Sequence, residues 1–170
     1  NFLHFESNTG VASLILYTLQ NITMEGLTFN KITDNIPCIN LDNWRVGGDL
    51  YIKNSFFSNI LMSTCITTTT KVKTFTTYLE GCQFINISTR KNIRGTYISG
   101  CGSSILCLNR GNLVVSECNF TNNVAEVNGG AIYAESDAIG IQNCQFVLCS
   151  AGPNEENGLG GAVFLNQTSN

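Results

Sequence analysis

The stretch that decides the fold is Leu113–Tyr133, which reads LVVSECNFTNNVAEVNGGAIY. Its first eight residues place apolar or small side chains at the first, third, sixth and eighth positions. The same pattern occurs five times, in Ile22–Phe29, Leu50–Phe57, Thr77–Phe84, Leu113–Phe120 and Ile139–Phe146. The closing Phe residues of these copies are 28, 27, 36 and 26 residues apart. A period of this length predicts a solenoid, in which each repeat is one coil that packs on its neighbours.

The spacing inside the repeat indicates which solenoid this is. Its first two inward positions alternate as in a β-strand, but the next one follows after three residues. The chain must therefore turn a corner there, and the corner pairs are all polar or glycine: Glu25-Gly26, Lys53-Asn54, Glu80-Gly81, Ser116-Glu117 and Gln142-Asn143. We expect an all-β, right-handed parallel β-helix of about five to six coils of roughly 27 residues, with its handedness taken from the usual crossover.

Composition narrows the function classes. Charged residues make up 12% of the chain and the net charge is −3, which argues against nucleic-acid binding. No apolar run approaches the roughly 18 residues of a membrane span. The chain begins without Met or a signal-peptide pattern, and both ends fall within repeat-like sequence. We expect residues 1–170 to be a single β-helix segment of a longer chain, or one that continues through further copies of itself.

Glycosylation sequons and cysteines suggest the compartment. The four sequons begin at Asn21, Asn86, Asn119 and Asn166. The repeat pattern turns Asn21 and Asn119 outward, although a chain rich in Asn and Thr also produces sequons by chance. Together with an even number of cysteines, eight, these sequons favour an extracellular or cell-surface location reached through the secretory pathway.

The cysteines recur at repeat positions. Cys82, Cys118 and Cys144 share one inward position, and Cys38 and Cys65 are 27 residues apart. Strands about 4.8 Å apart allow disulfides between coils, while free thiols also pack well in a core. The pairs we expect are Cys38–Cys65, Cys118–Cys144 or Cys82–Cys118, and Cys101–Cys107. There is no CxxC motif and His4 is the single histidine, so we expect no metal site and no cofactor.

Two sets of turn residues recur at fixed offsets. Asparagine follows the inward Phe by two positions in three coils, which predicts a hydrogen-bonded ladder of Asn59, Asn86 and Asn122. At the corner, charges alternate in sign between successive coils, at Glu25, Lys53 and Glu80. Such neighbours attract across adjacent strands and help to fix the register.

Two features offer a possible binding surface. The longest interval between Phe residues contains an insertion of about nine residues within Ser88–Gly102, and it carries Arg90, Lys91 and Arg94. This segment is either a binding surface or a solvated loop. Trp44 is either a stacking platform for a carbohydrate or a residue that packs over a turn.

Short motifs in the chain resemble a known family. Gly129-Gly130-Ala131-Ile132 and Phe120-Thr121-Asn122-Asn123 are similar to the GGAI and FxxN repeats of the polymorphic outer-membrane adhesins of Chlamydiae. Gly160-Gly161-Ala162-Val163 and Phe56-Phe57-Ser58-Asn59 are near copies. The chain also resembles the pectin-lyase-like β-helix proteins and large surface proteins of protists. These resemblances imply a β-helix and say less about function.

Three classes of function fit such a β-helix. Glycoside hydrolysis requires paired carboxylates and a lyase requires an acidic calcium site, but Asp42 and Asp49 lie seven residues apart in one coil and form no such pair. We expect no catalytic residue in this segment, and a structural or adhesive role in a glycosylated extracellular surface or filament protein. The alternative is a carbohydrate-binding, lyase or hydrolase β-helix whose active site lies in coils outside the segment. Expected partners are the rest of the chain or further copies, glycans or other surface proteins.

Overall fold

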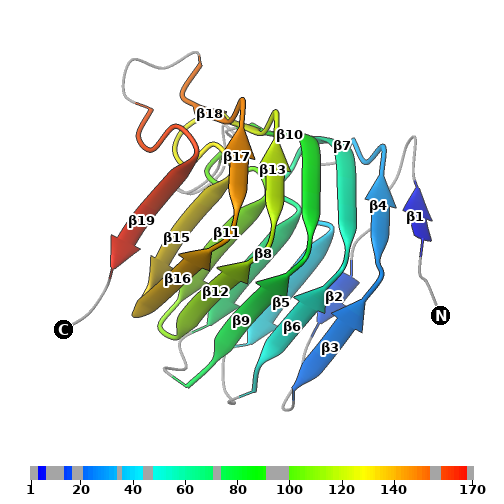
Figure 1. Cartoon of the computed structure of the whole chain (residues 1–170), viewed down its shortest axis with the longest axis vertical. Coiled ribbons are helices and arrows are strands. Elements are labelled where there is room, and N and C mark those ends of the chain that lie inside the picture. The colour runs from blue at the N-terminus through cyan, green and yellow to red at the C-terminus, as the bar shows by residue number, and fades with distance from the viewer. Residues whose placement is uncertain are drawn as a thin grey trace.

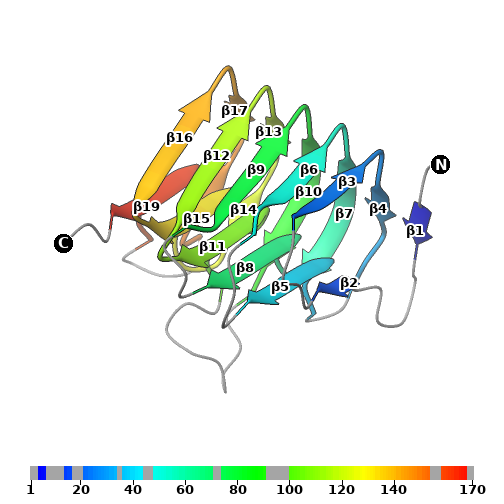
Figure 2. The ribbon, with the colours of Figure 1, turned by 90° about the horizontal axis from the view of Figure 1, so that it is seen from below.

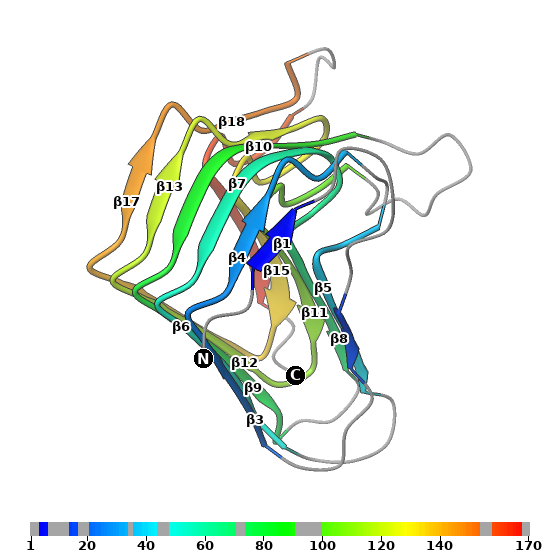
Figure 3. The same ribbon diagram turned by 90° about the vertical axis from the view of Figure 1, so that its right-hand side faces the viewer.

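The computed structural model describes residues 4–6, 14–16, 21–33, 36–43, 48–70, 74–90, 100–153 and 158–167. Its regular elements are β-strands, and they pair in parallel into three sheets that enclose one core (Figures 1 and 3). The predicted all-β parallel β-helix is confirmed. The described strands complete about four turns with partial coils at both ends, slightly fewer than the five to six coils expected. No helix in these ranges has the length and apolarity to cross a membrane.

Each coil passes in turn through sheets that we name C, A and B, as Figure 2 shows from below. Sheet C consists of β3 (Ile22–Glu25), β6 (Leu50–Lys53), β9 (Thr76–Glu80), β12 (Asn112–Ser116) and β16 (Ala138–Gln142). Sheet A consists of β1 (His4–Glu6), β4 (Thr28–Asn30), β7 (Phe56–Met62), β10 (Gln83–Thr89), β13 (Asn119–Thr121) and β17 (Gln145–Val147), with β14 (Val124–Ala125) and β18 (Ser150–Ala151) extending it. Sheet B consists of β2 (Leu14–Leu16), β5 (Ile39–Asn43), β8 (Ile66–Thr70), β11 (Ile105–Asn109), β15 (Ile132–Ser136) and β19 (Val163–Gln167).

The register of sheet C follows the repeat. Its first inward position pairs through successive coils as Ile22, Leu50, Thr77, Leu113 and Ile139. These side chains are fully buried in the middle coils and partly buried in the first and last. Every inward position therefore stacks on its counterpart in the next coil.

The corner between sheets C and A is formed by a residue in the left-handed conformation. The φ angle at this position is 67° at Gly26, 47° at Asn54, 63° at Gly81, 55° at Glu117 and 53° at Asn143. Glycine and asparagine adopt this conformation more easily than other residues. The predicted change of parity is thus a sharp turn at one residue. The polar corner residues also interact, because Lys53 and Glu80 form an ion pair of 2.8 Å and Asn54 donates to Glu25 at 2.9 Å.

Phenylalanines form a continuous stack on the inner face of sheet A. Ring centroids are 5.3 Å apart for Phe29 and Phe57, and 4.9 Å apart for Phe57 and Phe84. The stack continues at 4.9 Å from Phe84 to Phe120 and at 4.7 Å from Phe120 to Phe146. The rings are parallel to within 7° throughout. This confirms the predicted inward column.

The predicted asparagine ladder is present on the outer corner of sheet A. The Nδ2 of Asn59 donates to Asn30 Oδ1 at 3.1 Å, Asn86 donates to Asn59 at 3.2 Å, and Asn122 donates to Asn86 at 2.9 Å. Asn59, Asn86 and Asn122 all have φ between 53° and 56°. Leu148 takes the same conformation in the last coil, with φ 53°, and is 77% exposed.

The Gly-Gly-Ala motif is the turn that leads into sheet B. Gly129 has φ 63°, and a Cβ there would lie 2.2 Å from the Ile132 carbonyl oxygen. A Cβ on Gly130 would lie 2.0 Å from the carbonyl oxygen of Gly161 in the next coil. Gly160 repeats the first arrangement, because its Cβ would lie 2.3 Å from the Val163 carbonyl oxygen. Two glycines are therefore required by close backbone approaches within a coil and between coils.

Candidate functional site

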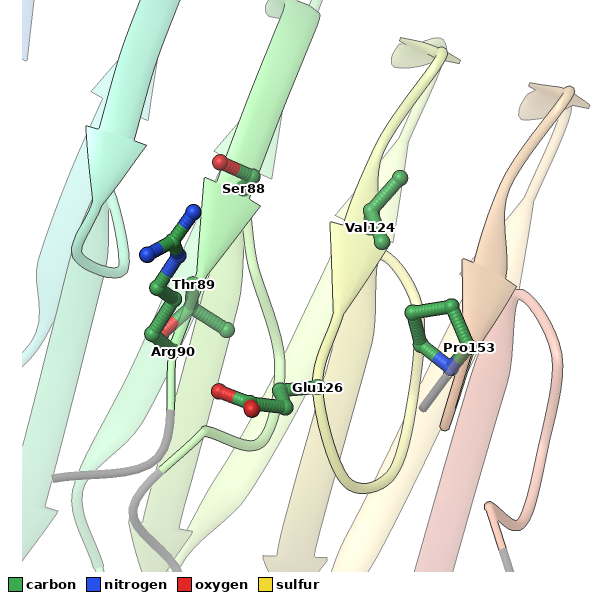
Figure 4. A pocket seen from close by; sticks show the side chains of 6 residues that line it. All are labelled: Ser88, Thr89, Arg90, Val124, Glu126 and Pro153. Atoms are coloured by element: carbon green, nitrogen blue, oxygen red, sulfur yellow. The ribbon is translucent and has the colours of Figure 1, made fainter. Parts of the chain in front are cut away.

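A cavity of about 380 Å³ opens where the strands of sheet A end (Figure 4). The pairing of Thr89 with Ala125 places Arg90 and Glu126 at equivalent positions of neighbouring coils. We call this feature the Arg90 groove, and its lining is Ser88, Thr89, Arg90, Val124, Glu126 and Pro153.

The lining combines a guanidinium, a carboxylate, two hydroxyls and two apolar side chains. Among the described residues of this lining Glu126 is the one acidic side chain, whereas carboxylate-based glycoside hydrolysis uses two. No group of three potential metal ligands occurs among the described residues. The groove has the chemistry to bind a small polar ligand through its charged and hydroxyl groups.

The structure places one of the four predicted surface-binding residues. Arg90, in the insertion within Ser88–Gly102, is exposed and lines the groove, and its role in binding stays a prediction. Trp44, Lys91 and Arg94 lie outside the described residues, so their predicted roles stay predictions.

All four sequon asparagines have exposed side chains: Asn21, Asn86, Asn119 and Asn166. The predicted outward orientation of Asn21 and Asn119 is confirmed. Asn21 uses its Oδ1 to accept a hydrogen bond from the Asp49 backbone N–H at 2.9 Å. Asn86 is instead an internal member of the asparagine ladder, where it donates through Nδ2 and accepts through Oδ1. The occupancy of these sequons stays a prediction.

The cysteines form the predicted columns but no disulfide. Cys82, Cys118 and Cys144 occupy equivalent positions, and the Cys82 backbone N–H donates to Cys118 Sγ at 3.4 Å. Each of the chain's eight cysteines falls within the described ranges and is a free thiol. The expected pairs Cys38–Cys65, Cys118–Cys144 or Cys82–Cys118, and Cys101–Cys107 are therefore not formed in this structure.

The thiols of the Cys82, Cys118 and Cys144 column are hydrogen-bonded. The thiols of this column contact backbone carbonyl oxygens, with Cys82 Sγ 3.5 Å from Ile52 O and Cys118 Sγ 3.2 Å from Ser116 O. Burial raises the pKa of the Cys65 thiol well above its ordinary value. The hydrogen bond between Cys82 and Cys118 raises the pKa of Cys118, to which burial adds, and lowers the pKa of Cys82. Thiols with a raised pKa, such as Cys65 and Cys118, are protonated core groups and not nucleophiles at neutral pH.

A buried asparagine completes the FxxN motif. Asn123 is fully buried at the position held by Ile60 and Ile87 in earlier coils. Its Nδ2 donates to the Phe84 carbonyl at 3.2 Å, and its Oδ1 accepts from the Ile87 backbone N–H at 3.2 Å. The sequence motif includes this residue, but its burial and its role in joining two coils were not predicted.

Two further features were missed by sequence reasoning. Tyr51 and Tyr78 stack on the outer face of sheet C, and their spacing of 27 residues between inward neighbours was an available signal. Gly102 has φ 57°, and a Cβ there would lie 2.2 Å from the Ile105 carbonyl oxygen, as at Gly129. The segment 102–105 is thus a third turn of the Gly-Gly-Ala type, although serine occupies its second and third positions.

One protein-family model matches part of this chain. The repeat of the Chlamydia polymorphic membrane protein family matches residues 117–135. That span begins at the left-handed corner residue Glu117 and contains Phe120, Asn123 and the Gly129-Gly130 turn. Comparisons with curated proteins and with solved structures gave no significant match. The chain is a β-helix repeat protein that resembles the chlamydial polymorphic membrane proteins.

Proposed function

We propose that this segment is a non-catalytic, adhesive rod of a cell-surface protein. The observation that supports this proposal most directly is that the residues of the matched repeat form the body of the coil. Its inward residues in 117–135 build the coil through the phenylalanine stack, the buried Asn123 and the glycine turn. A repeat used in this way supplies a rigid scaffold, and binding then depends on the outward side chains.

Similarity to a polymorphic membrane protein repeat supports a location on the outer membrane or cell surface. Exposed sequon asparagines agree with glycosylation there if the chain passes through a secretory pathway. Buried free thiols are compatible with either redox environment.

Asp49, one of the two aspartates considered above as a catalytic candidate, already accepts two hydrogen bonds. Asp49 Oδ1 accepts the Thr76 backbone N–H at 2.9 Å, and Asp49 Oδ2 accepts the Tyr51 hydroxyl at 3.2 Å. The first bond links successive coils of sheet C and the second lies within one coil, and both support a structural role for Asp49 over an acid–base role.

A bead assay tests the adhesive role. The folded chain is coupled to fluorescent beads, and binding to cultured epithelial cells is counted; the control is the same chain unfolded and alkylated. We expect saturable binding that soluble folded chain inhibits. Equal binding by the unfolded control overturns adhesion. Cleavage of polygalacturonate or another acidic polysaccharide that is lost in Asp42→Ala or Asp49→Asn overturns the non-catalytic role.

A further inference from the structure

Tyr51 in β6 and Tyr78 in β9 project from the outer face of sheet C. Their ring centroids are 4.6 Å apart and the angle between the ring planes is 0°. This separation is close to the spacing of about 4.8 Å between neighbouring strands, so the rings stack along the axis of the solenoid. Tyr51 covers one face of the Tyr78 ring, and the other face is turned toward the next coil.

The next two coils leave that face of Tyr78 partly uncovered. Tyr78 pairs in register with Val114, and Val114 pairs with Gly140. Valine is much shorter than tyrosine, and a Cβ at Gly140 would meet no atom within 4 Å. The outer surface therefore descends from Tyr78 over Val114 to Gly140. We name these three residues the tyrosine step.

The charged groups beside the step are engaged with other groups. Lys53 forms its 2.8 Å ion pair with Glu80, and Asp49 holds the Tyr51 hydroxyl and the Thr76 N–H. Amides stand on either side of the step in the outward columns, at Asn112 in β12, whose Nδ2 also donates to Thr76 Oγ1 at 3.3 Å, and at Gln142 in β16. The step thus presents an aromatic face with amide groups around it, which suits a neutral ligand rich in hydroxyls.

We propose that the tyrosine step binds one pyranose ring of a neutral glycan. The ring's C–H face stacks on the uncovered part of the Tyr78 ring above Val114 and Gly140, and its hydroxyls hydrogen-bond to Asn112 and Gln142. A single aromatic face and two small residues offer far less area than the roughly 800 Å² per partner of a protein interface, which favours a sugar over a protein. This inference rests on the proposed adhesive role, for which it names the ligand class.

Two variants test the step without disturbing the core. Gly140→Leu places a side chain in open space at a residue whose backbone does not require glycine, and so fills the step. Tyr51→Ala is the matched control, because it removes the other tyrosine and leaves the step intact. Binding is measured by saturation-transfer NMR with cellotetraose, maltotetraose and N-acetylchitotetraose, and with a tyrosine-containing peptide as the protein-like probe.

We expect at least one of the three sugars to bind the native chain and Tyr51→Ala, with affinity reduced about tenfold or more in Gly140→Leu and in Tyr78→Ala. The step is refuted if no sugar binds, if Gly140→Leu leaves sugar binding unchanged, or if the peptide alone binds. Bead adhesion that persists in Gly140→Leu without sugar binding refutes the step and leaves the adhesive role standing. If the native chain binds a sugar, Gly140→Leu abolishes that binding, and beads carrying the native chain do not adhere to cells, then the step is supported and the adhesive role is refuted.

Discussion

Replacement of Phe120 by alanine tests the central column of the fold. Phe120 is fully buried, and its ring lies between Phe84 at 4.9 Å and Phe146 at 4.7 Å. Removal of a buried Phe side chain costs about 3–5 kcal/mol. Both ring faces of Phe120 have an aromatic partner, and aromatic pairs add about 0.5–1.5 kcal/mol each beyond area. Two aromatic partners place the cost in the upper part of the first range, so we expect Phe120→Ala to lower the free energy of unfolding by about 4–5 kcal/mol.

Urea unfolding followed by far-UV circular dichroism measures this loss. Phe146→Ala in the last coil is the matched control, since its ring is only partly buried and stacks on one partner. We expect this control to cost about half as much, roughly 2 kcal/mol. A cost below about 1 kcal/mol for Phe120→Ala would refute its place in an inward stack. Equal costs at Phe120 and Phe146 would refute the difference in burial between the middle coil and the last coil.

Three further predictions concern the turns and the thiols. Asn86→Ala removes two hydrogen bonds of the ladder and places alanine at φ 56°, a conformation that asparagine adopts more easily. The free energy of unfolding, measured by thermal unfolding, should fall by about 2–3 kcal/mol. Asn86→Gly should lose less, because glycine keeps the backbone conformation. Gly129→Ala should cost more than about 3 kcal/mol by urea midpoint, since its Cβ meets the Ile132 carbonyl oxygen at 2.2 Å, whereas Gly140→Ala should cost less than about 1 kcal/mol. Burial raises the pKa of the Cys65 thiol and keeps it protonated where thiols of the unfolded chain ionise. Its contribution to the free energy of unfolding should therefore be constant below about pH 8.5 and fall above it, and Cys65→Ser should weaken that dependence in urea titrations between about pH 7 and 10.

Sequence predicted the inner surface of this fold well because each inward residue contacts its own counterpart one coil away. The spacing from Ile22 to Phe29 therefore fixed sheet C, the corner and the phenylalanine stack in one pattern. The asparagine ladder was predictable for the same reason, since Asn59 and Asn86 recur at one offset from an inward Phe. Periodicity is direct evidence of contact in a solenoid, which is not so in most globular folds.

Turns into sheet B were harder to predict because their length varies between coils. Gly102 lies 27 residues before Gly129, which is the usual period, but serine at positions 103 and 104 breaks the Gly-Gly-Ala match, and the shared backbone geometry makes the equivalence plain. The Arg90 groove lies at the same variable turn, so its walls come from coils whose relative register the period does not give. Disulfides were misjudged for a different reason. Cys82 and Cys118 are close enough for a disulfide, but the same column can also be filled by free thiols that contact backbone carbonyl oxygens.

Inward and outward positions of this molecule differ in how freely their residues can be replaced. An inward change such as Asn123→Leu removes both a donor to Phe84 and an acceptor for Ile87, and so leaves two backbone groups unsatisfied in the coil beneath. An outward change such as Gly140→Leu meets no neighbour at Cβ. Outward columns can therefore vary one residue at a time on an unchanged scaffold, while inward columns vary only with their counterparts. For the adhesive role proposed above, this favours the exposed faces of sheets A and C, and not the repeat motif itself, as the binding surface.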